Sequence, residues 1–253
     1  MKNFYQKTYN ALIIIILIFI FGCNAPDRNV DKKSILIVGL SAEYPPFEFQ
    51  QQGKIIGFDI DLIQAVGQKL DKEIQIQDMS FHSLIASLHT GKIDVAISGM
   101  TITPERLKNV DFTQVYYQPS LAIVYLKNQP LDSNIFSHKK IGVQLGTTME
   151  KWIKQQTKEQ QNAEIISLDT NPPLIEKLKL KQIDYIVIET LQAVEFCKLN
   201  PSLAFQTVGT SDEGYGIALA KNSALKSEID AALTALQADG TLEHIQEKWG
   251  LKQ

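Results

Sequence analysis

The sequence has few of the residues that mark redox, metal or thiol chemistry. It contains only 2 cysteines, Cys23 and Cys197, and 4 histidines in 253 residues. Cys197 stands among apolar neighbours, which predicts a small buried side chain rather than a nucleophile. If Cys23 is acylated, only Cys197 remains, so the chain builds neither a disulfide framework nor a cysteine metal site. The histidines show no Ser–His–Asp pattern or metal-ligand spacing and fit surface positions: His82, His89, His138 and His244. We predict no catalytic residue, metal site or cofactor.

A surplus of basic charge is also missing. The chain has 25 lysines and arginines against 28 acids, which gives a formal net charge of −3. Because no basic patch dominates, nucleic acid is excluded as a default partner. No sustained coiled-coil pattern is present either, so a monomer is the default expectation. Hydrophobic and charged residues make up 44% and 21% of the chain, as is typical of a globular protein.

The longest apolar run lies near the amino terminus and predicts an export signal. Lys2 and Lys7 precede the run 11–21, which ends at Gly22-Cys23. A basic start, a short apolar core and a small residue before the cut describe a signal peptide, here residues 1–22. The run is too short to span a bilayer comfortably, since that takes roughly 20 apolar residues.

The cysteine that follows the small residue resembles the lipobox of bacterial lipoproteins, in which the cysteine is lipidated and becomes the first residue. The match is imperfect, because Ile20 and Phe21 stand where leucine and a small residue are usual. We predict a lipid anchor at Cys23, a polar tether over 23–33, and a location in the periplasm or at the cell surface. A plain secreted protein and an uncleaved anchor are the alternatives.

Beyond the tether, short apolar runs alternate with segments whose apolar residues have helical spacing. In the first half this predicts strands over 34–39, 54–58, 73–77 and 92–97 and helices over 59–70 and 84–90. Asp59 is the predicted cap of the first helix, since an acid suits the positive end of the helix dipole. A metal site at Asp59 and Asp61 is not favoured, because no further ligands cluster nearby.

The second half repeats this rhythm. It predicts strands over 140–144, 163–167, 182–188 and 214–220, helices over 149–156, 172–180 and 191–199, and closing helices over 224–249 with a break at 238–241. Alternating strands and helices predict mostly parallel, helix-covered sheets. Two such α/β units favour a cleft between lobes, into which the carboxyl ends of the strands point ligand-binding loops.

One stretch, Ser98 to Arg106, follows a buried run and has the composition of an anion clamp. We read it as a small-residue loop and then a helix whose first turn holds Thr103, Pro104 and Arg106. A helix start favours a carboxylate or phosphate, and the planar fork of an arginine matches a carboxylate with two hydrogen bonds. The alternative is an ordinary strand–loop–helix with a surface arginine.

Several short motifs follow one another in an order that is more informative than any one of them. They are Tyr44-Pro45-Pro46-Phe47-Glu48, Gly57-Phe58-Asp59-Ile60-Asp61-Leu62, Phe81 before Leu84-Ile85, Ile93-Asp94 leading into Ser98 to Arg106, Gly142-Val143-Gln144 with Gly146-Thr147-Thr148, Ile183-Asp184 with Glu189, and Asp239-Gly240-Thr241 before Lys248-Trp249. This order resembles extracellular solute-binding protein family 3, the polar amino-acid-binding proteins of bacterial ABC importers, which include arginine- and lysine/arginine/ornithine-binding proteins.

The resemblance implies an α/β, two-lobe periplasmic-binding-protein fold of type II. Each lobe would be a mostly parallel sheet covered by helices, with the ligand in the interlobe cleft. The implied boundaries are 34–118 together with 215–253 for lobe 1, and 119–214 for lobe 2. The links between the lobes are expected near 118–122 and 209–214, where hinge closure would enclose the ligand.

The resemblance also implies how a zwitterionic amino acid is held. Arg106 would pair with the α-carboxylate, and Glu189 would hold the α-ammonium. Further contacts would come from five small residues and one amide: Ser98, Gly99, Thr101, Thr147, Thr148 and Gln144. A desolvated zwitterion needs one cation and one anion, because an unpaired buried charge is costly.

Tyr44 and Phe81 would sandwich the ligand side chain, which for a cationic group adds a cation–π contact. One position departs from the pattern, since many relatives have Asp or Asn where this chain has Ser41. A serine cannot balance a ligand cation. Either Glu43 or another acid substitutes, or the ligand is neutral.

These features predict a substrate-binding lipoprotein of an ABC importer rather than an enzyme. It would capture a polar amino acid, with a basic one favoured and arginine first, and deliver it to a membrane permease. The alternatives are a neutral polar ligand such as glutamine, or a secreted enzyme on the same fold, such as a cyclohexadienyl-type dehydratase that uses cleft carboxylates.

Overall fold

The computed structural model describes residues 34–131, 135–158, 162–210 and 213–251. The predicted signal peptide, the predicted lipid anchor Cys23 and the predicted tether lie outside the described residues. Within these ranges, no helix combines the length and apolar character that a membrane crossing needs.

The first five-stranded sheet has the order β5-β1-β6-β13-β7. Its strands are β1 (Ser34–Leu40), β5 (Lys72–Asp78), β6 (Val95–Ala96), β7 (Val110–Phe112) and β13 (Ala218–Ala220). β5, β1 and β6 are parallel, and β13 runs against both of its neighbours. Four of the five strands therefore point one way, as the alternating pattern predicts.

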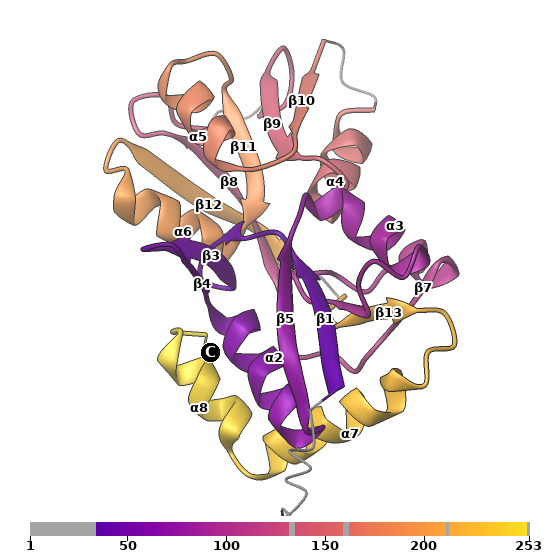
Figure 1. The fold of residues 1–253 in the computed structure, drawn as a ribbon. Coiled ribbons are helices and arrows are strands. Elements are labelled where there is room, and N and C mark those ends of the chain that lie inside the picture. The colour runs from indigo at the N-terminus through magenta and orange to yellow at the C-terminus, as the bar shows by residue number, and fades with distance from the viewer. Residues whose placement is uncertain (1–33, 132–134, 159–161, 211–212, 252–253) are drawn as a thin grey trace, which may run out of the picture. The chain divides into compact units, whose positions relative to one another are not determined.

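Helices cover both faces of this sheet (Figure 1). They are α2 (Phe58–Lys69), α3 (Leu84–His89), α7 (Leu225–Ala238), α8 (Thr241–Lys248) and the short 3₁₀ helix η1 (Phe81–Ser83). Alternate residues of β1 serve the two faces, because side chains of a strand point to opposite sides. Leu36 and Val38 pack in the cluster of α2, α7 and α8, whereas Ile37 packs in that of α3.

The second sheet has the order β10-β9-β11-β8-β12. Its strands are β8 (Ser120–Leu126), β9 (Lys140–Gln144), β10 (Glu164–Leu168), β11 (Tyr185–Glu189) and β12 (Leu203–Thr210). Here β8 is the reversed strand. The helix α4 (Thr148–Gln156) packs with one apolar cluster, and α5 (Pro172–Lys179) and α6 (Thr190–Leu199) pack with another.

The chain passes between the two sheets twice, between β7 and β8 and again between β12 and β13. In each sheet the reversed strand is the first one that the chain forms after a passage. The two passages also touch, because Tyr117 and Tyr215 form an isolated antiparallel bridge. The strands β7, β8 and β12 are not among those that the sequence predicts.

A small third sheet is inserted after β1 and comprises β2 (Glu43–Tyr44), β3 (Glu48–Gln51) and β4 (Lys54–Ile56). It leads into α2 through Gly57, whose φ is 142°. A Cβ at Gly57 would lie 2.0 Å from the carbonyl oxygen of Phe47. Only glycine fits this junction, because its left-handed backbone and its close approach both disfavour a side chain.

Two predictions about local structure are wrong. Gly57 rather than Asp59 is the N-cap of α2, and Asp59 lies inside the first turn, fully buried. The segment with Arg106 is not an α-helix but the 3₁₀ helix η2 (Arg106–Lys108), with Arg106 as its first residue. A helix this short has little dipole, so the Arg106 side chain itself must supply the positive charge.

We expect Gly57→Ala to lower the free energy of unfolding by about 3 kcal/mol, because the new methyl group meets backbone and not a flexible side chain. Urea denaturation measures this change in the free energy of unfolding. Gly53→Ala is the matched control: Gly53 has φ 75° and nothing within 4 Å of its added Cβ, so only about 1 kcal/mol of backbone strain is expected. Equal losses in both variants would contradict the steric argument.

Candidate functional site

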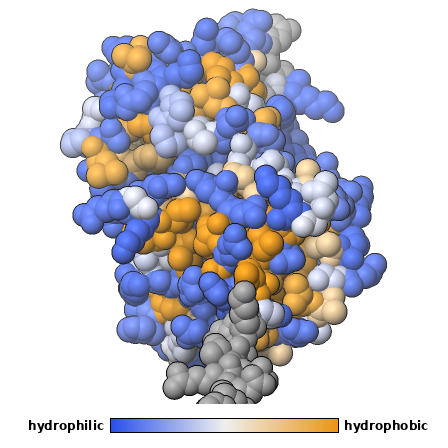
Figure 2. Space-filling model, in the orientation of Figure 1, coloured by the Kyte–Doolittle hydropathy of each residue, from blue (hydrophilic) through white to orange (hydrophobic). Residues whose placement is uncertain are grey.

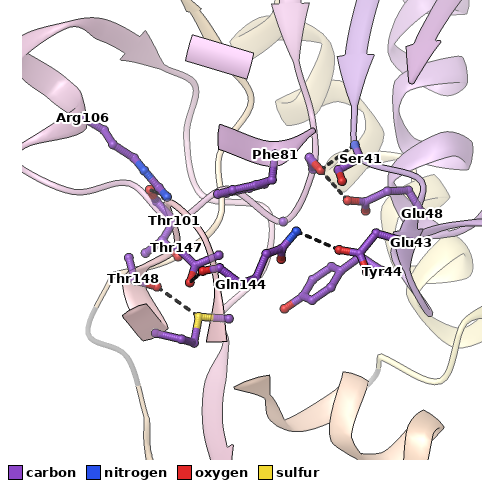
Figure 3. Close-up of a pocket in the computed structure, with 13 residues that line it drawn as sticks. Ser41, Glu43, Tyr44, Glu48, Phe81, Thr101, Arg106, Gln144, Thr147 and Thr148 are labelled. Carbon is purple, nitrogen blue, oxygen red and sulfur yellow. Dashed lines mark hydrogen bonds between the residues drawn. The ribbon is translucent and has the colours of Figure 1, made fainter. Parts of the chain in front are cut away.

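A cavity lies between residues of the two large sheets (Figure 3). The first sheet and its insertions contribute Ser41, Glu43, Tyr44, Glu48, Phe81, Ser98, Gly99, Thr101 and Arg106, and the second contributes Gln144, Thr147, Thr148 and Met149. Most of these residues follow the carboxyl ends of the parallel strands β1, β6 and β9. Ligand-binding loops in open α/β sheets gather at such ends.

Arg106 is the buried cation of this site. Its side chain donates from Nη1 to the carbonyl of Thr101 at 2.8 Å and from Nη2 to the carbonyl of Gly146 at 3.0 Å. The guanidinium also lies 5.3 Å from the centre of the Phe81 ring. Burial lowers the pKa of Arg106 to about 10, which leaves it cationic at neutral pH. Among the described residues it forms no ion pair with a carboxylate, so the site is suited to an anion.

The amino end of α4 adds to this positive end. Thr147 is the N-cap: its Oγ1 accepts from the amide of Glu150 at 3.2 Å and donates to the carbonyl of Gln144 at 2.8 Å. The start of a nine-residue helix offers free amides and a positive dipole end. Because Arg106 bonds to Gly146 just before this helix, the guanidinium and the helix start face the same anion subsite.

Acidic groups lie at the opposite end. Figure 3 shows Arg106 on one side of the cavity and Glu43 and Glu48 on the other, with Phe81 and Gln144 between them. Glu43 accepts from Nε2 of Gln144 at 2.7 Å and from the amide of Asn171 at 2.9 Å. Burial raises the pKa of Glu43 to about 8, although these two donors lower it. A cation brought beside Glu43 would restore its charge.

The loop after β6 is fixed from below by two acids. Ser98 donates to Oε1 of Glu48 at 2.6 Å, and the amide of Gly99 donates to Oδ2 of Asp59 at 2.9 Å. The amide of Ser41 in turn donates to Oγ of Ser98 at 3.1 Å. The predicted residues Ser41, Ser98 and Gly99 are thus brought together with Thr101 and Arg106.

Tyr44 and Phe81 are buried and line the cavity. The Tyr44 hydroxyl lies 3.0 Å from that of Tyr215, and its ring stacks on Phe47 at 5.4 Å. These contacts fix the Tyr44 ring from behind. Both rings stand where the sequence predicts a sandwich around a side chain, and that role stays a prediction.

Glu189 does not lie in the cavity wall. It is fully buried at the end of β11, where its Oε2 accepts from the amides of Leu191 and Gln192 at 2.7 and 3.2 Å and caps α6. Burial raises the pKa of Glu189 to about 7 against these donors. The structure therefore gives Glu189 a capping role, and its contact with an ammonium group stays a prediction.

Sequence reasoning did not place Glu48 and Met149 in the wall, and it named Glu43 only as a possible substitute for the acid missing at position 41. Glu48 carries a signal that was available: an acid between the aromatic residues Phe47 and Phe49. Met149 is the second residue of α4 and directly follows the predicted site residues Thr147 and Thr148. Among the described residues no cluster of potential ligands could hold a metal ion.

The chain matches known proteins over nearly its whole length. A model of bacterial extracellular solute-binding proteins, family 3, matches residues 36–252. The arginine-binding extracellular protein ArtP of Bacillus subtilis (strain 168) is 34% identical over 253 residues, which cover 98% of each chain. ABC transporter arginine-binding protein 1 of Escherichia coli (strain K12) is 36% identical over 246 residues, covering 94% of this chain and 97% of the relative.

Solved structures agree. An ancestral arginine-binding protein bound to arginine has a TM-score of 0.81 and 38% identity, covering 86% of this chain and 98% of its own. An ancestral arginine-binding protein bound to glutamine has a TM-score of 0.82 and 37% identity, covering 87% of this chain and 99% of its own. These matches confirm the predicted resemblance and the two-lobe α/β fold.

The raised pKa of Glu43 predicts how stability changes with pH. The folded chain keeps a proton on Glu43 up to about pH 8, whereas the unfolded chain loses it near 4.5. Between these values the folded state binds more protons, so the contribution of Glu43 to stability falls as the pH rises, by at most about 1.4 kcal/mol per pH unit.

We therefore expect Glu43→Gln to gain stability relative to the wild type as the pH rises from about 5 to 8, measured by urea unfolding at a series of pH values. Glu176→Gln, at an exposed position, is the control and should follow the wild-type slope. A Glu43→Gln slope that equals the wild-type slope would contradict a raised pKa at this site.

Proposed function

This chain belongs to the bacterial extracellular solute-binding proteins of family 3, and we propose from that premise that it captures a free basic amino acid, arginine first, for an ABC transporter. The observation that carries this proposal is the polarity of the cavity. A buried guanidinium and a helix start stand at one end, and the carboxyl group of Glu43 stands at the other. An extended ligand with a carboxylate at one end and a cation at the other fits this arrangement.

At the positive end, Arg106 and the start of α4 hold the α-carboxylate, helped by Thr101 and Thr148. A carboxylate takes the guanidinium as a planar pair of hydrogen bonds. Ser98 supplies a hydroxyl and Gly99 a carbonyl to the α-ammonium group. Glu189, at the end of β11, balances the charge of this ammonium group when the cleft is closed. Each ligand charge then has a partner after water is removed.

At the acidic end, Glu43 takes the role of the acid that is missing at Ser41. It reaches the cavity from β2 and touches Gln144 of the second sheet. The aliphatic part of the ligand lies between Tyr44 and Phe81. A guanidinium beside these rings adds a cation–π contact of about 1 kcal/mol or more when desolvated. The relatives that are named as arginine-binding proteins support arginine as the proposed ligand.

Capture works by closure of two lobes. We place the sheet with β1 in lobe 1 (34–118 and 215–253) and the sheet with β9 in lobe 2 (119–214), with hinges near 118–122 and 209–214. Contacts that join the lobes across the cleft include Glu43 to Gln144 and Asn171, and Arg106 to Gly146. At the surface, Glu105 pairs with Lys151. A ligand that bridges both lobes favours the closed population.

Outside the described residues, we propose that a signal peptide over 1–22 exports the chain and that lipidated Cys23 anchors it, with 23–33 as a tether. The anchored monomer then stays near a membrane permease that takes over the ligand. Glutamine is the second candidate ligand, because Glu43 already accepts a hydrogen bond from the side-chain amide of Gln144. The related ancestral protein that was solved with glutamine supports this alternative.

Calorimetry of residues 34–253, stripped of bound ligand by unfolding and refolding, tests the proposal across the standard amino acids. We expect arginine to bind most tightly, with a dissociation constant of about 1 μM or lower, which corresponds to about 8 kcal/mol. The bound molecule should be recovered unchanged from the denatured complex. Failure of every amino acid to bind would overturn the proposal, and a chemically altered ligand would favour the enzyme alternative.

Arg106→Ala should weaken arginine binding at least about a hundredfold, because the ligand carboxylate loses a buried charged partner. Circular dichroism and the unfolding transition should stay close to those of the wild type. Lys179→Ala is the control, since Lys179 pairs with Glu176 at an exposed position of α5 outside the cavity wall, and it should leave the affinity unchanged. Unchanged affinity in Arg106→Ala would remove the clamp from the proposal.

Binding should also release protons in a ligand-specific way. At about pH 7 the Glu43 carboxyl is mostly protonated, and an arginine guanidinium beside it would lower its pKa, so that close to one proton leaves per arginine bound. Calorimetry in two buffers of different ionisation enthalpy counts these protons. Glutamine should release fewer, and Glu43→Gln should abolish the difference. Equal release with both ligands would contradict the assignment of Glu43.

A further inference from the structure

Two buried carboxyl groups interact at the acidic end of the cavity, where Glu48 is part of the wall and Asp59 is not. Glu48 comes from β3 and Asp59 from the first turn of α2, and both are 0% exposed. The two side chains lie close enough for the charge of one to act on the other. The groups that face the pair are other acids and phenols of the same buried layer: Glu43, Tyr44, Tyr116 and Tyr215. No described lysine, arginine or histidine forms an ion pair with either carboxyl group.

The hydrogen bonds account for only half of the oxygens. Oε1 of Glu48 accepts from the hydroxyl of Ser98. Oδ2 of Asp59 accepts from the amide of Gly99 at 2.9 Å and from the hydroxyl of Tyr116 at 3.0 Å. The remaining oxygens, Oε2 of Glu48 and Oδ1 of Asp59, are buried and receive no N–H or hydroxyl donor. One proton shared between these two oxygens, as a carboxyl–carboxylate bond, would give both of them a partner.

We propose that Glu48 and Asp59 share one proton, carried by Glu48, and that this pair positions the Ser98-Gly99 loop to receive the ligand. The positioning part of the inference rests on the proposed function. Glu48 carries the proton because Asp59 already has two donors, which stabilise a carboxylate, whereas Glu48 has one. The direction of the titration agrees: burial raises the pKa of Glu48 well above its ordinary value, and that of Asp59 to about 6.

The shared proton matters because the loop has little freedom. Gly99 has φ 50°, and a Cβ there would lie 2.8 Å from the Tyr44 ring. Its amide and the Ser98 hydroxyl are bound by the two acids, and Ser98 also holds the amide of Ser41. As a neutral acid, Glu48 accepts from Ser98 and donates to Asp59 at once. As two buried anions, the pair would repel and displace the loop. Glu48 and Asp59 are thus positioning residues.

Infrared spectroscopy of the ligand-free protein tests the shared proton directly. At about pH 9 ordinary carboxyl groups are ionised, and Glu43 and Glu189, with pKa values of about 8 and 7, are mostly ionised too. We expect one carboxylic-acid C=O band to remain in the wild type and in the control Glu43→Gln, and to be absent in Glu48→Gln. No band in the wild type, or an unchanged band in Glu48→Gln, would overturn the shared proton.

Arginine binding tests the positioning role. In Glu48→Gln the amide oxygen can accept from Ser98 and the amide N–H can donate to Asp59, so affinity at neutral pH should stay within about threefold of the wild type. Glu48→Ala leaves both partners unpaired and should weaken binding about thirtyfold. Above the pH at which Glu48 loses its proton, the wild type should lose more affinity than Glu48→Gln. Titration of the ligand affects both proteins equally and cancels in this comparison.

Equal loss in the glutamine and alanine variants would overturn the positioning role. The two proposals also fail separately. Arginine binding without the carboxylic-acid band overturns the shared proton and leaves the proposed function standing. The band without binding of any amino acid supports the shared proton and overturns the function.

Discussion

The site depends on one constraint: the guanidinium of Arg106 is buried, and no described carboxylate pairs with it. Removing such a cation from water costs several kcal/mol, and only strong local partners can offset this. Two backbone carbonyls and the Phe81 ring do so in part. One of those carbonyls belongs to Gly146, on the loop before α4. The charge of Arg106 is therefore partnered by both halves of the fold. An anion held by Arg106 and the start of α4 would require the two halves to lie close together.

Topology explains how these partners meet. In each sheet four strands share a direction, and β1, β6 and β9 end at the cavity. The reversed strands β13 and β8 follow directly on the two passages between the sheets. Because the chain turns back in this way, both sheets present the carboxyl ends of their parallel strands to the same space. Residues about forty positions apart, such as Arg106 and Gly146, then come within hydrogen-bond distance.

Sequence reasoning reached the elements with strong local patterns and most of the cavity wall. Sustained apolar periodicity predicts helices such as α2 and α7. The links predicted near 118–122 and 209–214 include parts of β8 and β12. The sequence pattern predicts Asp59 as a cap, because an acid in a first turn suits the helix dipole. Its real partners, Gly99 and Tyr116, lie 40 and 57 residues away in the sequence. Only the tertiary fold shows that Glu48 and Asp59 touch.

The carboxyl groups of this site divide into two kinds once their partners are known. Glu43 accepts from an amide of each neighbour across the cleft and faces the cavity, so a ligand cation can replace the proton that burial places on it. Oε2 of Glu48 and Oδ1 of Asp59 are buried and receive no N–H or hydroxyl donor, so in our proposal the proton between them stays out of reach of a ligand. In our proposals, the first kind responds to the charge of the ligand, and the second keeps the geometry of the loop constant. A proton neutralises a buried acid as a cation does. Because no described basic side chain pairs with these acids, Glu43 can exchange its proton for a ligand cation, whereas Glu48 and Asp59 keep theirs.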